Sequence, residues 1–355
     1  MAILLNRLLP GNSLPPGTAT DSEGAVLEAC RASVQGARSL AFIPERFRDD
    51  VALLRGVCCL MDRIVTAPDA VSPASELARL EAELLGEVPG RALVRLARTR
   101  LAGIGIEPGL FRFLIAGVRR ELDSAPLQDD DELLCYAYCV AGVVGLMLWA
   151  ALDDSRSRAV PYILDLGIGL ELTNIVRDWP ADAARARCFL PARRLAPYGL
   201  TPQRITQEWR DPEVQQRLRP ALEGMLRFGD HYYRSVENGA GEIPIRYRHA
   251  LLILGRVYRR EGWRTVQGAA SQPARRTVPM WERAMVLSRV AGLALTPRVA
   301  GLVTPPPHDW RLHRAFAGLP GADPAGGAPE GAGTPSMASR LLWRRRGTGP
   351  VRRTW

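Results

Sequence analysis

The sequence predicts an all-α protein, and three observations support this. Apolar residues recur at intervals of three and four in most long segments of the chain. No stretch alternates apolar and polar residues as a half-buried β-strand would. Hydrophobic residues make up 47% of the 355 residues. That share is enough to bury one large helical core or two smaller ones.

Four segments show the helical period most clearly: residues 77–88, 109–122, 160–178 and 249–260. In each of them, the apolar side chains would share one face of a helix and bury it against neighbouring helices. An acidic cluster at residues 129–132 precedes a further apolar run. Helix capping and complementation of the helix dipole explain this cluster without a bound metal.

That further run, residues 133–152, contains 20 residues and no charge, which is long enough to cross a bilayer. A membrane span and a buried core helix are the two readings. Gly142 and Gly145 lie at its centre, and acidic residues flank it without a basic side. We therefore expect a buried helix.

The formal charge of +10 comes from 47 arginines without any lysine. Residues 340–355 contain six of these arginines and no acidic residue, so much of the excess lies in one terminal tail. We therefore expect no nucleic-acid partner. The six cysteines form no CxxC pair, and the first residues lack a secretory pattern, which together predict a reduced, cytoplasmic protein.

Composition divides the chain into three parts. Residues 1–25 read as an N-terminal extension, residues 26–303 as one helical domain, and residues 304–355 as a disordered tail rich in Pro, Gly and Arg. The end of the tail combines Leu341, Leu342 and Trp343 with clustered arginines. It would either adsorb peripherally to an anionic membrane or remain a soluble basic end.

Asn174, Asp178 and Asp182 recur every four residues inside an apolar segment, so a helix would place them in one polar stripe. Oxygen ligands without His or Cys suit Mg²⁺, which binds through one or two carboxylates together with substrate phosphates. The alternative is that the two carboxylates form ordinary ion pairs on a solvated face. The arginines that could form such pairs are Arg177, Arg185 and Arg187.

The surrounding residues resemble those of a known family. The run TNIVRD, followed by an Arg-rich turn and CFLP, resembles the second aspartate-rich motif of the squalene and phytoene synthase family. Just upstream, YAYCVAGVVGLM at Tyr136 to Met147 is similar to that family's YCYxVAGTVGLM. Weaker similarities extend the resemblance over roughly residues 27 to 290.

The resemblance implies a single-domain, all-α isoprenoid-synthase fold with a central apolar cavity. Asn174, Asp178, Asp182 and Asp62 would hold Mg²⁺, and the three aspartates would serve catalysis. Other residues would contact a prenyl diphosphate substrate. These are Arg177, Arg187, Arg276, Tyr136, Ala141, Gly142 and Gly145.

The first aspartate-rich motif departs from the family's DDxxD pattern. Asp62 matches its first aspartate, whereas Arg63 and Thr66 stand at the second and third positions. Cys59 replaces the arginine that usually precedes the motif. Pro180 lies between two ligands of the second motif and would kink or loosen the helix there.

Two functions follow from the resemblance. The first is an Mg²⁺-dependent prenyltransferase of isoprenoid biosynthesis, with a product of the squalene, hydroxysqualene or phytoene type; whether NADPH takes part is left open. The second is a catalytically silent member that acts as a partner subunit or assembly factor for a complete homologous synthase. The altered first motif favours the silent member, and the retained second motif favours the enzyme.

Overall fold

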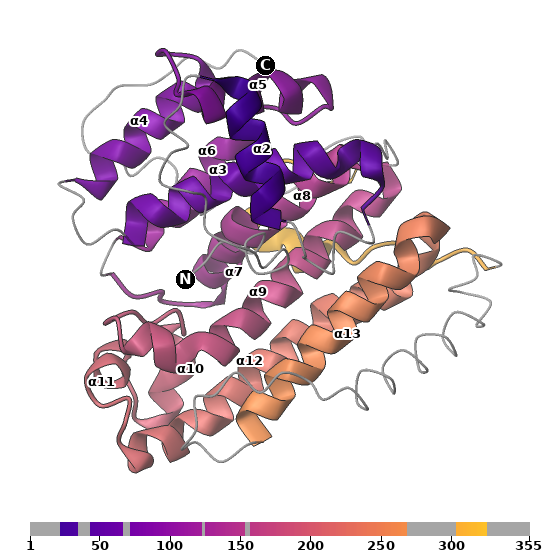
Figure 1. Ribbon diagram of the computed structural model, residues 1–355. Helices are drawn as coiled ribbons and strands as arrows, with labels where there is room; N and C mark the ends of the chain where they lie inside the picture. The colour runs from indigo at the N-terminus through magenta and orange to yellow at the C-terminus, as the bar shows by residue number, and fades with distance from the viewer. Residues whose placement is uncertain are drawn as a thin grey trace.

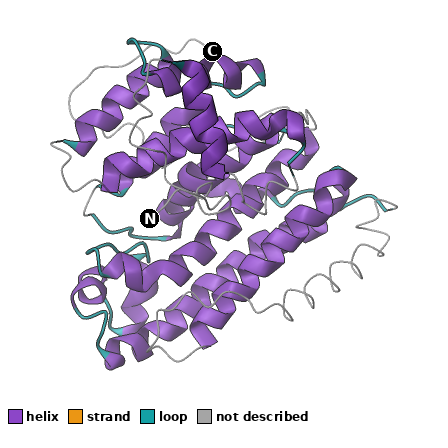
Figure 2. Ribbon diagram, in the orientation of Figure 1, coloured by secondary structure: helices purple, strands orange, loops and turns teal. Residues whose placement is uncertain are grey.

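The computed structural model describes residues 22–34, 43–66, 72–122, 125–152, 157–267 and 303–324. Every regular element in these ranges is helical (Figures 1 and 2). The structure therefore confirms the all-α class. Segments 160–178 and 249–260 lie within helices, and segments 77–88 and 109–122 end three and two residues beyond theirs. Arg276 and the end of the tail fall outside the described ranges.

Five helices form the N-terminal half: α2 (Glu23–Val34), α3 (Arg48–Thr66), α4 (Pro73–Leu85), α5 (Ala92–Gly103) and α6 (Gly109–Arg120). Helix α3 packs against α2 and α5, and also contacts α4 and α6. The cap residues define α4 locally. The Ser72 hydroxyl accepts a hydrogen bond from the Ser75 amide at 3.4 Å, and Gly86 ends the helix with a φ of 79°.

The uncharged run forms one continuous helical stretch of three parts: α7 (Asp130–Ala137), the π-helical turn η3 (Tyr138–Gly142) and α8 (Val143–Ala151). Asp129 caps it by accepting a hydrogen bond from the Glu132 amide at 3.1 Å, as expected for the acidic cluster. The stretch is long and apolar enough to cross a membrane, but 78% of its most apolar window is buried inside the protein. This burial is what a core helix requires.

Helix α9 (Val160–Ala183) lies between the N-terminal helices and the pair formed by α12 (Pro212–Asn238) and α13 (Ile245–Gln267) (Figure 1). It also packs against η3 and α8. A Cβ on Gly167 would lie 2.8 Å from the Ala141 carbonyl oxygen, so glycine permits this close crossing. The helix continues through Pro180 to Ala183.

The short helices α10 (Ala192–Leu195) and α11 (Pro202–Gln207) connect α9 to α12. Ala186 precedes them in the turn after α9 and has a φ of 57°, which is unusual for a residue other than glycine. The Asp182 carbonyl accepts hydrogen bonds from the Arg185 and Arg187 amides across this turn, both at 2.9 Å. This geometry directs the CFLP segment back toward α9.

The expectation that disorder begins at residue 304 was wrong for residues 304–324. They include the 3-10 helix η7 (Trp310–Phe316), which packs against α7. Phe316 is fully buried and stacks on Tyr138, with ring centroids 5.1 Å apart. The Tyr138 hydroxyl donates a hydrogen bond to the Pro320 carbonyl at 3.0 Å, and the Tyr232 hydroxyl donates to that of Leu312 at 3.0 Å. The Pro- and Gly-rich composition concealed these few apolar anchors.

Candidate functional site

The polar stripe lies on the C-terminal half of α9, as the four-residue spacing predicts. Asn174 is fully buried, Asp182 is 3% exposed, and the Asp178 side chain is 26% exposed. The stripe thus runs from the protein interior to a solvent-accessible position and back. An apolar helix face surrounds it, because Ile175 and Val176 are both buried.

Asn174 is the polar residue of the stripe that lies deepest. Its Nδ2 donates a hydrogen bond to Oε2 of Glu171 at 3.1 Å. Its Oδ1 is buried and has no hydrogen-bond partner among the described residues. An amide oxygen in this state costs free energy unless a donor or a cation satisfies it. This atom therefore fits the hard oxygen ligand that Mg²⁺ takes.

Asp178 forms an ion pair with its sequence neighbour, Arg177. Nε of Arg177 lies 2.9 Å from Oδ1 of Asp178, and the guanidinium also lies 3.7 Å from Glu261 and 5.7 Å from the Tyr258 ring centroid. Burial alone would lower the pKa of Arg177, but the hydrogen bond to Asp178 raises it above its ordinary value. The ordinary ion pair considered from the sequence is thus present for Asp178.

Asp182 and Arg187 line the same small hollow, which Trp179, Phe189 and Ile205 also border. Burial raises the pKa of the Cys188 thiol in its wall to about 11. Arg187 forms an ion pair with Glu121 at 3.3 Å. Glu121 is a buried carboxylate just after α6 and lies outside both sequence motifs. An acidic residue that ends an apolar helix was the only sign of it.

Glu121 also joins Arg187 to Tyr136, another residue expected at the substrate site. The Tyr136 hydroxyl donates a hydrogen bond to Oε1 of Glu121 at 3.4 Å. The Tyr136 ring stacks on Phe189, with centroids 5.1 Å apart and planes inclined by 18°. Two of the residues from separate motifs, Tyr136 and Arg187, are therefore brought together by a residue that neither motif contains.

Ala141, Gly142 and Gly145 lie at the crossing of η3 and α8 with α9, and Ala141 and Gly142 are buried. A Cβ on Gly142 would lie 3.2 Å from Leu164, and one on Gly145 would lie 3.3 Å from Ile163. In this structure the small side chains therefore let two helices approach closely. Their role in shaping a substrate pocket stays a prediction.

Asp62 lies on α3, in the other half of the fold, and is half-buried. Arg63 and Thr66 are exposed, and the Thr66 hydroxyl donates a hydrogen bond to the Asp62 carbonyl at 2.7 Å. Helix α8 contacts both α3 and α9. That Asp62 faces Asp178 across a cleft stays a prediction.

Comparisons with known proteins agree with this architecture. The sequence profile of the squalene/phytoene synthase family matches residues 31–282. The 15-cis-phytoene synthase of Enterobacter agglomerans is 34% identical over 187 residues, which are 52% of this chain and 62% of that protein. That of Paracoccus sp. (strain N81106 / MBIC 01143) is 28% identical over 258 residues, 68% of this chain and 83% of that protein. This chain thus spans less than two thirds of the first relative.

Solved structures show the same fold. A dehydrosqualene synthase superposes with a TM-score of 0.62 at 21% identity, covering 76% of this chain and 96% of its own. The squalene synthase of Alicyclobacillus acidocaldarius gives a TM-score of 0.56 at 19% identity, covering 72% and 96%. Because the family profile spans most of the chain and these structures share its helical architecture, the chain belongs to the squalene/phytoene synthase family.

Proposed function

We propose that this protein is an Mg²⁺-dependent prenyltransferase of isoprenoid biosynthesis that condenses or rearranges prenyl diphosphates. One observation carries the proposal. The buried Oδ1 of Asn174 lacks a hydrogen bond among the described residues, and the carboxylates of Asp178 and Asp182 follow one and two turns later on α9. Family membership supplies the class of substrate.

Asn174, Asp178 and Asp182 would hold Mg²⁺ in this proposal, with Asp62 contributing from α3. When bound, the ion would neutralise charge on the diphosphate and help it to leave. Asp178 must first exchange its pairing with Arg177, whose guanidinium is 2.9 Å away. The exchange would release Arg177 to hold a diphosphate oxygen, with Glu261 at 3.7 Å keeping its guanidinium close to the site.

Tyr136 and Phe189 would exclude water on the apolar side of the site, because their stacked rings are both buried. Arg187, fixed by Glu121, would offer a second cation at the hollow beside Asp182. The expected products are of the squalene, hydroxysqualene or phytoene type.

To test this, the purified full chain is incubated with farnesyl or geranylgeranyl diphosphate and excess Mg²⁺. Diphosphate release and the products formed are then measured. Asp178→Ala should reduce turnover by about 10²-fold or more, the usual loss when a group facing a developing charge is removed. Glu213→Ala is the matched control, since it removes an exposed carboxylate paired with Arg217 on α12. Equal turnover in wild type and Asp178→Ala would refute direct catalysis at this site.

A second function is favoured by one specific observation, namely that Arg63 and Thr66 occupy positions where the family's first motif carries carboxylates. A silent member would bind and assist a complete homologous synthase instead of reacting itself. If the protein consumes no substrate but stimulates such a synthase equally as wild type and as Asp178→Ala, the partner role replaces the enzyme.

A further inference from the structure

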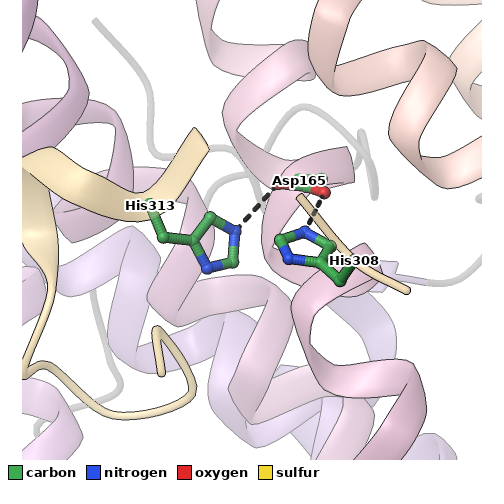
Figure 3. Close-up of side chains that lie close together, drawn as sticks. All are labelled: Asp165, His308 and His313. Carbon is green, nitrogen blue, oxygen red and sulfur yellow. Dashed lines mark hydrogen bonds and ion pairs between the residues drawn. The ribbon is translucent and has the colours of Figure 1, made fainter. Parts of the chain in front are cut away.

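A second polar cluster lies near the N-terminal end of α9, away from the stripe. Asp165 meets His308 and His313 of the C-terminal segment there (Figure 3). Nε2 of His308 lies 2.8 Å from Oδ2 of Asp165, and Nε2 of His313 lies 2.9 Å from Oδ1. The three side chains are at most 3% exposed. The cluster is therefore closed to solvent.

The Asp165 carboxylate is fully buried, and each of its oxygens faces an imidazole nitrogen. An ionised carboxylate removed from water requires a positive charge beside it. The two imidazoles bonded to it carry no charge in their neutral form.

The contacts of His313 indicate where a positive charge beside Asp165 would lie. Its Nδ1 lies 3.1 Å from the carbonyl oxygen of Ala322, which can only accept, so Nδ1 carries the proton. In neutral His313, the Nε2 lone pair then faces the lone pairs of Oδ1 at 2.9 Å. Such a contact is repulsive unless a cation lies between the two atoms.

We propose that Asp165, His308 and His313 form a binding site for a divalent transition metal ion such as Zn²⁺. Two imidazole nitrogens and one carboxylate converge within 4.8 Å of one another, which provides three protein ligands of the kinds that Zn²⁺ takes. The alternative is a proton on Nε2 of His313, because neutral His308 can donate its own Nε2 hydrogen to Oδ2. Imidazole ligands favour Zn²⁺ over Mg²⁺, so this site differs in chemistry from the α9 stripe.

The surroundings match a structural metal site in most respects. A carbonyl oxygen that orients the second nitrogen of a ligating histidine, as Ala322 does for His313, is the usual outer partner. In a tetrahedral site, nitrogen and oxygen donors at Zn²⁺ distances lie about 3.3 Å apart, so the imidazoles would move outward by roughly half an ångström. Nδ1 of His308 has no hydrogen-bond partner among the described residues, so the outer shell is one contact short.

The function of such a site would be to fasten residues 303–324 to α9. The ligands are separated by 143 and 148 positions in the sequence. A cross-link over so long a stretch restricts the unfolded chain strongly, and the free energy of metal binding adds to folding. Because no substrate can enter a closed site, the ion would stabilise the protein without taking part in the reaction.

The experiment uses tag-free, full-length protein. Elemental analysis should find about one Zn²⁺ per chain, and X-ray absorption at the zinc edge should show nitrogen and oxygen neighbours without sulfur. His313→Gln and His308→Gln should each lower the zinc content by tenfold or more. His231→Gln, which alters an exposed histidine on α12, and Asp178→Ala should both leave it unchanged.

A measurement on the wild type covers the case in which these variants fail to fold. Removing the ion with a chelator should lower the Tm, and adding Zn²⁺ but not Mg²⁺ should restore it. A chain that takes up no Zn²⁺, that binds it through sulfur, or whose Tm ignores both chelator and Zn²⁺ would overturn the proposal. A protonated His313 paired with Asp165 would then remain as the source of charge.

Discussion

At the residue scale, the site depends on a few side chains whose partners decide what they can do. Asn174 presents an amide oxygen that no described residue satisfies, and Asp178 is held by the arginine beside it. The turn that follows brings Arg187 to Glu121. It does so with Ala186 in a left-handed conformation.

Ala186→Gly should stabilise the protein. The φ of 57° at Ala186 costs about 1 kcal/mol or more for a residue with a Cβ, and glycine removes that cost. Chemical denaturation should show an increase of about 0.5 to 1 kcal/mol in the free energy of unfolding. Ala184→Gly is the matched control, because Ala184 has a φ of −60° and should lose stability instead. A gain at both positions would contradict this account.

Glu83→Gln tests a buried ion pair. The Glu83 side chain is fully buried; it accepts hydrogen bonds from Nε of Arg91 at 2.9 Å and from the Arg91 amide at 3.2 Å. Burial would raise its pKa, but the bonds to Arg91 lower the pKa below 4.5. The substitution should cost about 2 to 4 kcal/mol at pH 7. Glu87→Gln, in an exposed pair with Arg112, should cost less than about 1 kcal/mol.

The pH dependence of this ion pair follows from the direction in which folding shifts the pKa of Glu83. Because folding depresses the pKa of Glu83, its contribution is fully present above about pH 4.5 and is lost as the pH falls through the folded-state pKa. Denaturation curves of the wild type and of Glu83→Gln should therefore converge as the pH drops below 4.5. A difference that stays constant from neutral to acidic pH would show that the carboxylate charge is not what stabilises this contact.

At the element scale, the close crossing of α9 with η3 and α8 fixes the position of the helix that carries Asn174, Asp178 and Asp182. Gly167 faces the Ala141 backbone there, and the backbone cannot move aside as a flexible side chain could. The position of α9 is thus determined by glycine in one half and by its packing on α12 and α13 in the other. A substitution at this crossing should therefore displace the whole of α9.

Gly167→Ala should destabilise the protein even though alanine favours helices. The new Cβ would lie 2.8 Å from the Ala141 carbonyl oxygen, and overpacking of this kind costs about 1 to 3 kcal/mol. Thermal unfolding should show the loss. Gly103→Ala, at the end of α5 with no atom within 4 Å of the new Cβ, should be neutral or mildly stabilising. Equal effects at the two glycines would argue against the close crossing.

At the scale of the whole molecule, residues 303–324 pack back onto the helical domain. Phe316 packs on Tyr138. His308 and His313 of the segment contact the two carboxylate oxygens of Asp165 on α9. The segment thus contacts α9 and the helical stretch made of α7, η3 and α8. These elements together carry most of the candidate site. Its docking joins the end of the domain to the middle of the chain.

Phe316→Ala should cost about 3 to 5 kcal/mol, the usual range for truncating a fully buried aromatic residue. Arg314→Ala, with a side chain 81% exposed, should change stability by less than about 0.5 kcal/mol. Chemical denaturation of both variants makes the comparison. If Phe316→Ala unfolds at the same denaturant concentration as the wild type, the segment does not contribute to the folded core.

The sequence by itself determined what local patterns encode. Periodicity identified the helices at α4, α6, α9 and α13, and four-residue spacing put Asn174, Asp178 and Asp182 on one stripe. The acidic residues at the start of α7 were correctly read as a cap and first turn, and motif order identified the family. Each of these signals lies within a few turns of chain, where spacing alone decides which side chains share a face.

Only the tertiary structure decided which distant residues meet. Glu121 joins Tyr136 to Arg187, and Asp165 meets two histidines that lie 143 and 148 positions away in the sequence. Residues 303–324 lack the composition of a core, yet dock through single anchors such as Phe316. Contacts across more than a hundred residues leave no period in the chain, because they arise from burial of one side chain against a surface that many other segments build.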